Sequence, residues 1–258
     1  MEQPEPPPGL THTVVDGVAT VVISNPAKRN AMTTAMWRAL PPLLDALAAD
    51  PAVRVLVLTG AGAAFCAGAD IAALREPGTG AQEAAVRAEE ALAAFPRPTL
   101  AAVRGPCVGG GAQLAVACDL RFAEEGAVFG VTPARLGVVY PAAATRRLIA
   151  LTGPATAKYL LFSAELIDTG RALRGGLVDE VLPPGALAER VAAFTRVLTG
   201  RSLLTQTAAK EFAAGDAGPE RVAHWERQAR EQALPGGDTA EGAAAFLERR
   251  SPRFTWNG

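Results

Sequence analysis

The order of apolar and polar positions divides the chain into strand-like runs that alternate with helical stretches up to about residue 181. Thr13–Val15 and Val18–Ile23 predict a hairpin, because Asp16-Gly17 between them is a strong signal for a tight turn. Val53–Thr59 is an almost continuous apolar run, which is typical of a strand buried on both faces. After residue 181 the pattern is helical only.

The predicted helices have an apolar stripe and recognisable ends. The first begins at Thr33 or Thr34 and runs to about Ala48, with a kink or a break expected at Pro41-Pro42. Asp70 opens a second helical pattern, for which an N-cap is its plain structural role. The other predicted helices are Ala81–Ala94, Thr145–Leu151, Pro154–Phe162, Ala186–Leu198, Leu203–Ala213, Glu220–Glu231 and Thr239–Arg249. The remaining predicted strands are Thr99–Val103, Asp119–Ala123, Ala127–Phe129 and Val178–Val181.

This order of elements predicts three parts. Residues 1–11 are acidic and proline-rich at their start and are expected to form a flexible tail. Residues 12–183 are expected to form an α/β core of repeated strand–strand–helix units. Residues 184–258 are expected to form a helical C-terminal part.

Composition narrows the classes of function. The chain has 258 residues, 49% of them hydrophobic, and a formal net charge of −1. A near-neutral chain lacks the charge pattern of a protein that binds nucleic acid or an anionic membrane, and no apolar run is long enough to span a bilayer. The cysteines number three, without metal-site spacing, so we expect reduced core thiols, no metal and a cytoplasmic location.

Candidate chemistry centres on Gly105–Asp119, which follows the predicted strand Thr99–Val103. Its glycine run, Gly109 to Gly111, opens a short apolar helix. Glycine lets backbone approach a ligand, and the first N–H groups of a helix have no partner inside it. The stretch is therefore suited to an oxygen that carries or gains negative charge, although a plain tight turn is the alternative explanation.

A second junction of the same kind is Phe65–Ile71, after the buried strand Val53–Thr59. Two such junctions can present converging backbone N–H groups. Converging donors are what a thioester oxygen needs when it becomes an enolate, and losing one donor typically costs roughly 2.7–4 kcal/mol of barrier.

These segments together resemble the crotonase superfamily, also called the enoyl-CoA hydratase/isomerase family. The resemblance runs from about residue 12 to the end and includes Asn25–Met32, Ala67–Ile71, Gly105–Asp119, Phe129–Pro133, Leu136-Gly137, Thr145–Leu148 and Glu241–Arg250. It implies a crotonase-like spiral of strand–strand–helix units. It also implies a homotrimer formed through the C-terminal helices, often paired as a dimer of trimers.

The resemblance further implies an acyl-CoA or acyl-carrier-protein thioester as substrate, with coenzyme A as part of the substrate and no separate cofactor. The N–H groups of Ala69 and Gly110 would hold the thioester oxygen. The residues implied along the coenzyme A portion are Lys28, Ala67, Asp70 and Ile71. The alternatives are a solvated surface lysine at Lys28 and a loop-stabilising cap at Asp70.

The sequence departs from the family at both glutamates that its hydratases use. The matching positions are Gln113 and Pro133, and an amide cannot exchange a proton near neutral pH. Decarboxylation of a malonyl-type thioester needs no such base. Gln113 could hydrogen-bond the substrate carboxylate, and Tyr140 lies in a loop, residues 132–140, that is similar to the loop of methylmalonyl-CoA decarboxylases.

Three alternatives stay open at this point. Glu89 or Glu90 could supply a rearranged acid/base for hydration or double-bond isomerisation, although a solvated helix face is the usual position for such residues. A non-catalytic acyl-CoA-binding homologue is the second. In the third, Tyr140 is a core aromatic and Gln113 a helix-surface amide. His12 and His224 are expected to be peripheral.

Overall fold

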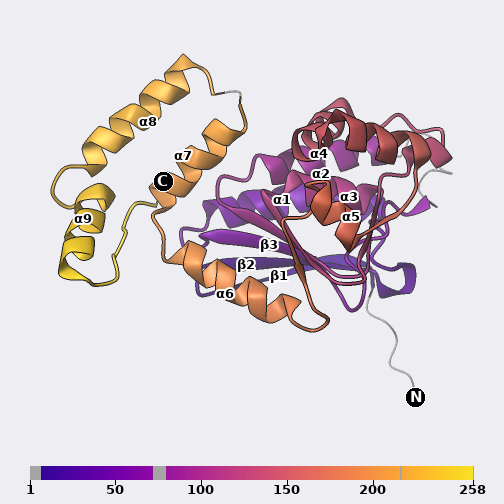
Figure 1. The fold of residues 1–258 in the computed structure, drawn as a ribbon, viewed down its shortest axis with the longest axis horizontal. Helices are drawn as coiled ribbons and strands as arrows, with labels where there is room; N and C mark the ends of the chain where they lie inside the picture. Colours follow the sequence, from indigo (N-terminus) through magenta and orange to yellow (C-terminus); the bar gives the residue numbers. More distant parts are fainter. Residues whose placement is uncertain (1–6, 72–79, 216, 258) are drawn as a thin grey trace.

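Two β-sheets and the helices around them form the fold (Figure 1). The structure, a computed structural model, describes residues 7–71, 80–215 and 217–257. Within these ranges the larger sheet has the strand order β1-β2-β3-β4-β6-β9, and the smaller has the order β5-β7-β8. The strands are β1 (Gly9–Val15), β2 (Val18–Ser24), β3 (Val55–Gly60), β4 (Thr99–Val103), β5 (Pro106–Val108), β6 (Leu120–Glu124), β7 (Val128–Gly130), β8 (Ile167–Asp168) and β9 (Glu180–Leu182).

The helices follow the predicted ones closely. They are α1 (Thr34–Ala49), α2 (Ala81–Ala93), α3 (Gly110–Ala117), α4 (Ala142–Ser163), α5 (Thr169–Arg174), α6 (Leu187–Thr199), α7 (Leu203–Ala213), α8 (Pro219–Gln232) and α9 (Asp238–Glu248), with short 3-10 turns η1 (Pro26–Lys28) and η3 (Pro133–Arg135). Thr33 is the N-cap of α1, because its side chain accepts a hydrogen bond from the Met36 N–H. The two helical stretches predicted around residue 153 form one element, α4, whose helical geometry is interrupted at Gly153.

The predicted hairpin is confirmed. Val15 pairs with Val18, and both turn residues have positive φ, 50° at Asp16 and 81° at Gly17. Such a turn matches the twist of the flanking strands. β2, β3, β4, β6 and β9 then pair in parallel, and every residue of β4 is buried.

The repeated strand–strand–helix plan positions the site. In two units, β4-β5-α3 and β6-β7-α4, the first strand joins the larger sheet and the second joins the smaller. The sequence did not predict β5, β8 or α5, because elements of 3, 2 and 6 residues are too short to show a periodic pattern. The mixed α/β architecture is the one expected.

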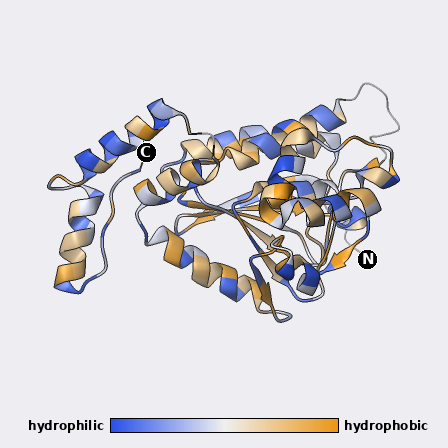
Figure 2. Cartoon of the chain, turned by 45° about the horizontal axis from the view of Figure 1, so that its top comes forward, coloured by the Kyte–Doolittle hydropathy of each residue, from blue (hydrophilic) through white to orange (hydrophobic). Residues whose placement is uncertain are grey.

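The larger sheet lies between two layers of helices. Helices α1, α2, α3 and α4 cover one face, and α6 packs on the other against β3, β4 and β6 (Figure 1). Apolar residues concentrate in the strands, whereas α8 is mainly hydrophilic (Figure 2). In the described part of the chain, the elements after β9 are all helices, and α8 and α9 pack on each other to one side of the sheet.

The helix α1 differs from the expectation of a kink or a break, because one helix continues through Pro41 and Pro42. Proline has a helical φ but cannot donate a hydrogen bond, so the helix loses two backbone bonds there. Its buried face, which includes Leu40, Leu44 and Leu47, keeps it in register against the core. The helical pattern predicted to begin at Asp70 falls on residues 72–79, which lie outside the described residues.

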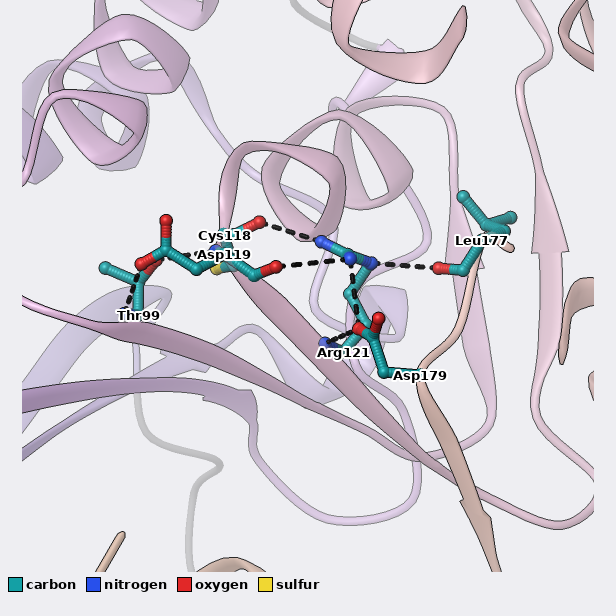
Figure 3. Close-up of polar contacts among 6 residues, drawn as sticks. All are labelled: Thr99, Cys118, Asp119, Arg121, Leu177 and Asp179. Carbon is teal, nitrogen blue, oxygen red and sulfur yellow. Dashed lines mark hydrogen bonds and ion pairs between the residues drawn. The ribbon is translucent and has the colours of Figure 1, made fainter. Parts of the chain in front are cut away.

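A polar network around the buried Arg121 ties the end of α3 to the sheet (Figure 3). The Arg121 side chain is 1% exposed and donates to the carbonyls of Cys118 and Leu177 at 2.7 and 2.9 Å, and to Asp179 Oδ2 at 3.0 Å. Asp119 accepts from the Thr99 N–H and hydroxyl at 2.7 and 2.9 Å. β4, β6 and the segment before β9 all meet at this network. The network therefore fixes the position of the last turn of α3, and because α3 is only eight residues long, this also helps to position its first turn.

Candidate active site

The two strand-to-helix junctions lie side by side. Cys66 pairs with Cys107 as an isolated parallel bridge, and Met32 pairs with Ala69 in the same way. The Cys66 N–H donates to the Pro106 carbonyl at 2.9 Å, and the Val108 N–H donates to the Cys66 carbonyl at 3.0 Å. These bonds connect the loop after β3 to β5, directly before Gly109 and α3.

Glycine is required where the junctions meet. A Cβ on Gly111 would lie 2.2 Å from the Cys66 carbonyl oxygen, and one on Gly110 would lie 2.8 Å from Trp37. Gly68 and Gly109 have positive φ, 115° and 55°. The backbone therefore approaches its neighbours more closely than a side chain would allow.

Ala69 and Gly110 present unused N–H groups at this point. Among the described residues, no hydrogen bond uses either N–H, whereas the neighbouring N–H groups of Asp70 and Gly109 donate to Met32 and Gly130 carbonyls at 2.8 Å. A Cβ on Gly110 would lie 3.3 Å from the Ala69 nitrogen, so the two residues face the same small volume. Gly110 is also the first residue of α3, where the helix dipole favours negative charge.

A cavity of about 180 Å³ opens in front of these groups. Most of its lining is apolar or backbone, and its described residues are Met32, Trp37, Ala67, Gly68, Ala69, Asp70, Ile71, Ala81, Gln82, Ala85, Gly109, Gly110, Gln113, Thr132, Pro133, Leu136, Val138, Val139, Tyr140 and Pro141. The structure thus brings together all four residues that were predicted to act on the thioester: Ala69, Gly110, Gln113 and Tyr140. Their roles stay predictions.

Gln113 lies against a buried carboxylate that the sequence did not identify as its partner. Gln113 Nε2 donates to Glu89 Oε2 at 2.7 Å, and Arg147 Nη1 donates to Glu89 Oε1 at 2.5 Å. Glu89 is 0% exposed, so the expectation of a solvated face is wrong for it and confirmed for the exposed Glu90. Gln113 itself is buried, which corrects the alternative of a helix-surface amide.

Tyr140 faces the cavity with an unsatisfied hydroxyl. The oxygen is buried and has no hydrogen-bond partner among the described residues. The ring packs against the core, but the hydroxyl donates to no carbonyl there, which a purely structural tyrosine would be expected to do. Burial raises the pKa of the Tyr140 hydroxyl above its ordinary value, and the nearby Glu89 and Cys107 raise it further. The side chain is therefore a neutral donor.

The residues implied for coenzyme A lie at one side of the cavity. Ala67, Asp70 and Ile71 line it, whereas Lys28 does not. Lys28 Nζ instead forms an ion pair with Asp70 at 2.6 Å, and its side chain is 52% exposed. Asp70 balances the charge of Lys28, and the pair lies beside the cavity because Asp70 lines it.

The remaining candidate groups lie elsewhere. His12 is exposed on β1, and the ring of His224 makes an edge-to-face contact with the ring of Trp225 on α8. The cysteines are free and buried, as expected, and burial raises the pKa of Cys66 and of Cys118 to about 12. In the described ranges no three metal-binding side chains gather into a site. Across the same ranges, each helix is too short or too polar to cross a bilayer.

The arrangement is suited to one kind of step. Two unused N–H groups can stabilise an enolate oxygen, and an apolar cavity beside them strengthens such electrostatic contacts. The sequence alone indicated neither Trp37, whose ring leaves no room for a side chain at position 110, nor the Glu89–Arg147 pair. Arg147 belongs to a segment that matched the family, but its carboxylate partner is 58 positions away in sequence and no local pattern indicates it.

Comparison with known proteins gives one consistent result. The family profile described as enoyl-CoA hydratase/isomerase matches residues 13–257. A putative enoyl-CoA hydratase of Thermus thermophilus is 38% identical over 92% of this chain and 97% of its own length. A crotonyl-CoA hydratase of Syntrophomonas wolfei is 34% identical over 92% and 94%. The crystal structure of an enoyl-CoA hydratase/isomerase family member superposes with a TM-score of 0.91 at 38% identity, covering 99% of this chain and 100% of that one.

Proposed function

The chain belongs to the enoyl-CoA hydratase/isomerase family, the crotonase superfamily, and we propose that it decarboxylates a malonyl-type acyl-CoA thioester. The observation that carries this proposal is the set of ionisable groups around the acyl cavity. Among the described lining residues the one carboxylate is Asp70, which is paired with Lys28. By the resemblance to the family, Gln113 and Pro133 match the positions of the two hydratase glutamates.

Decarboxylation forms an enolate without removing a proton. The bond between the α-carbon and the carboxylate breaks, CO₂ leaves, and the electron pair moves to the thioester oxygen. The N–H groups of Ala69 and Gly110 would stabilise that oxygen. The cost of burying a carboxylate in an apolar cavity falls as its charge moves toward the oxyanion site, which favours the same step.

The two side chains then have separate tasks. Gln113 keeps one N–H of its amide, after donating the other to Glu89, and can hold the substrate carboxylate. Tyr140 can deliver a proton to the α-carbon and regain one from solvent. Its raised pKa keeps the hydroxyl protonated at neutral pH.

Hydration or isomerisation with a rearranged acid/base is the second candidate. It is favoured by the printed names of the relatives and by the Glu89 carboxylate, 2.7 Å from Gln113. It ranks lower because both Glu89 oxygens already accept hydrogen bonds and Glu89 does not line the cavity. A non-catalytic acyl-CoA-binding protein would have no need of two unused N–H groups beside an acyl cavity.

We extend the proposal to assembly. The α9 side chains of Phe246 and Leu247 are 83% and 80% exposed, and α8 and α9 lie apart from the larger sheet. Burying such residues between copies would stabilise a homotrimer or a dimer of trimers. Substitution Phe246→Asp should then lower the mass measured by light scattering during gel filtration. The proposed substrate is a thioester of coenzyme A or of a carrier protein, and the proposed location is cytoplasmic, which three buried free thiols support.

The substrate proposal is tested by incubating the protein with malonyl-, methylmalonyl- and ethylmalonyl-CoA in D₂O. Mass spectrometry should show a product shortened by CO₂ that carries one deuteron. Gln113→Ala should reduce this turnover by about 10²-fold, if its amide holds the carboxylate in line for cleavage. Equal turnover by Gln113→Ala, Tyr140→Phe and the wild type on every thioester would show that these roles are misassigned.

A further inference from the structure

An ion pair between the buried Glu89 and the partly exposed Arg147 lies against Gln113, and neither residue is among the described residues that line the cavity. We propose that Glu89 is a positioning residue that fixes the orientation of the Gln113 amide. The positive charge of Arg147 balances the Glu89 carboxylate, which would otherwise repel an anionic substrate. This inference rests on the proposed decarboxylation. Glu89 comes from α2, Gln113 from α3 and Arg147 from α4, so three helices meet at this contact.

The hydrogen bond to Glu89 allows only one orientation of the Gln113 amide. A carboxylate only accepts hydrogen bonds, whereas an amide group has a donating end and an accepting end. Glu89 Oε2 accepts from Gln113 Nε2 at 2.7 Å, and Oε1 accepts from Arg147 at 2.5 Å. Both oxygens are thus occupied, and rotating the amide by 180° would put two oxygens in contact. Gln113 therefore keeps a defined N–H for a ligand.

The charge of the pair also matters to the substrate. Glu89 is 0% exposed, and an uncompensated buried carboxylate next to the acyl cavity would repel a second carboxylate. Arg147, 31% exposed, forms an ion pair with Glu89 and balances that charge. A malonyl-type substrate then meets an oriented amide without a net negative charge next to it.

A purely structural ion pair would behave differently. Replacing both partners of a buried pair by apolar residues of similar volume is often neutral or stabilising. Glu89→Met/Arg147→Met should therefore lower the melting temperature only by the few degrees that leaving the Gln113 N–H without its acceptor costs, yet it releases the amide of Gln113. A large loss of rate beside so small a loss of stability is the signature of positioning.

The experiment is a double-mutant cycle on kcat and KM for methylmalonyl-CoA, with thermal unfolding measured in parallel. In Glu89→Gln, the carbonyl oxygen of the new side chain accepts the hydrogen bond from Arg147, so its NH₂ group faces Gln113. The Gln113 amide must then rotate to present its oxygen to that group. We expect Glu89→Gln to lower kcat/KM by about 10²-fold, the loss typical of a group misplaced by about 1 Å. Glu90→Gln, an exposed change on the same helix, is the matched control.

The cycle decides between the two roles. We expect Glu89→Gln/Gln113→Ala to match Gln113→Ala within about threefold, because Glu89 acts through Gln113. Losses that multiply, or wild-type rates in Glu89→Met/Arg147→Met, would overturn the proposal. If the wild type decarboxylates nothing, the proposed function fails, and methylmalonyl-CoA is then a stable ligand. The same cycle on its Kd, by calorimetry, should still be non-additive if Glu89 positions Gln113, and additive values would refute it.

Discussion

The Tyr140 hydroxyl offers a sharp test, because the structure predicts that its removal separates stability from activity. The oxygen is buried and makes no hydrogen bond to a described residue, so Tyr140→Phe breaks no protein–protein bond. Breaking a buried hydrogen bond would strand its partner at a cost of about 1–3 kcal/mol. Without such a partner, we expect the free energy of unfolding to fall by less than about 1 kcal/mol, or to rise.

The stability and rate of this variant can be measured on one preparation. In a chain of this length 1 kcal/mol corresponds to about 2–4 °C in Tm, so calorimetry should show a shift within that range. Loss of a general acid typically lowers kcat by about 10²–10⁴-fold, and we expect a loss in that range for methylmalonyl-CoA decarboxylation.

The chain supplies its own control for this change. Its other tyrosine, Tyr159, donates its hydroxyl to Glu165 at an exposed position and does not line the cavity. Tyr159→Phe should therefore leave kcat unchanged. The reasoning is refuted if Tyr140→Phe lowers Tm by more than about 4 °C, which would indicate a structural hydroxyl, or if it retains the wild-type kcat.

Three further predictions address other parts of the molecule. Ala69→Pro removes one unused N–H and should lower kcat by about 10²–10³-fold, whereas Ala69→Val keeps the N–H and should retain most of the rate; steady-state kinetics on both variants checks this. Gln113→Glu sets a second carboxylate against Glu89 and should lower Tm by about 5–10 °C, with recovery when Glu89→Gln is added; unchanged Tm in the single variant would contradict the contact. The pKa of Glu211 is lowered from 4.5 to about 2, mainly by its hydrogen bond from Arg221, so its stabilising contribution is present above pH 4.5 and lost as pH falls toward 2; Tm measured across this window should fall less steeply in Glu211→Gln.

Local patterns in the sequence were sufficient to predict most of the fold. The Asp16-Gly17 turn, the Thr33 cap and the buried runs of β3 and β4 all follow from short-range rules. The strands β5 and β8 did not, because segments of 3 and 2 residues are defined by their partners and not by their own pattern. The prolines of α1 show tertiary packing overriding a local preference.

The features of the candidate site likewise divide into those that the sequence predicted and those that it did not. The glycine junctions were visible in the sequence, since close approach requires glycine. The burial of Glu89 was not visible, because a glutamate on an amphipathic helix is usually solvated. Its burial depends on hydrogen bonds from Gln113 on α3 and Arg147 on α4, which no local pattern indicates. The unpartnered hydroxyl of Tyr140 likewise depends on what three-dimensional packing places around it.

The central claim is that the protein forms its enolate by losing CO₂ and not by exchanging protons with a base. It is tested most directly by a paired assay on the wild-type protein, following crotonyl-CoA hydration by the loss of enoyl absorbance and methylmalonyl-CoA decarboxylation by mass spectrometry. We predict decarboxylation with hydration at background. Hydration without decarboxylation would contradict the claim and would indicate that another group, with Glu89 the nearest carboxylate to Gln113, replaces the missing glutamates.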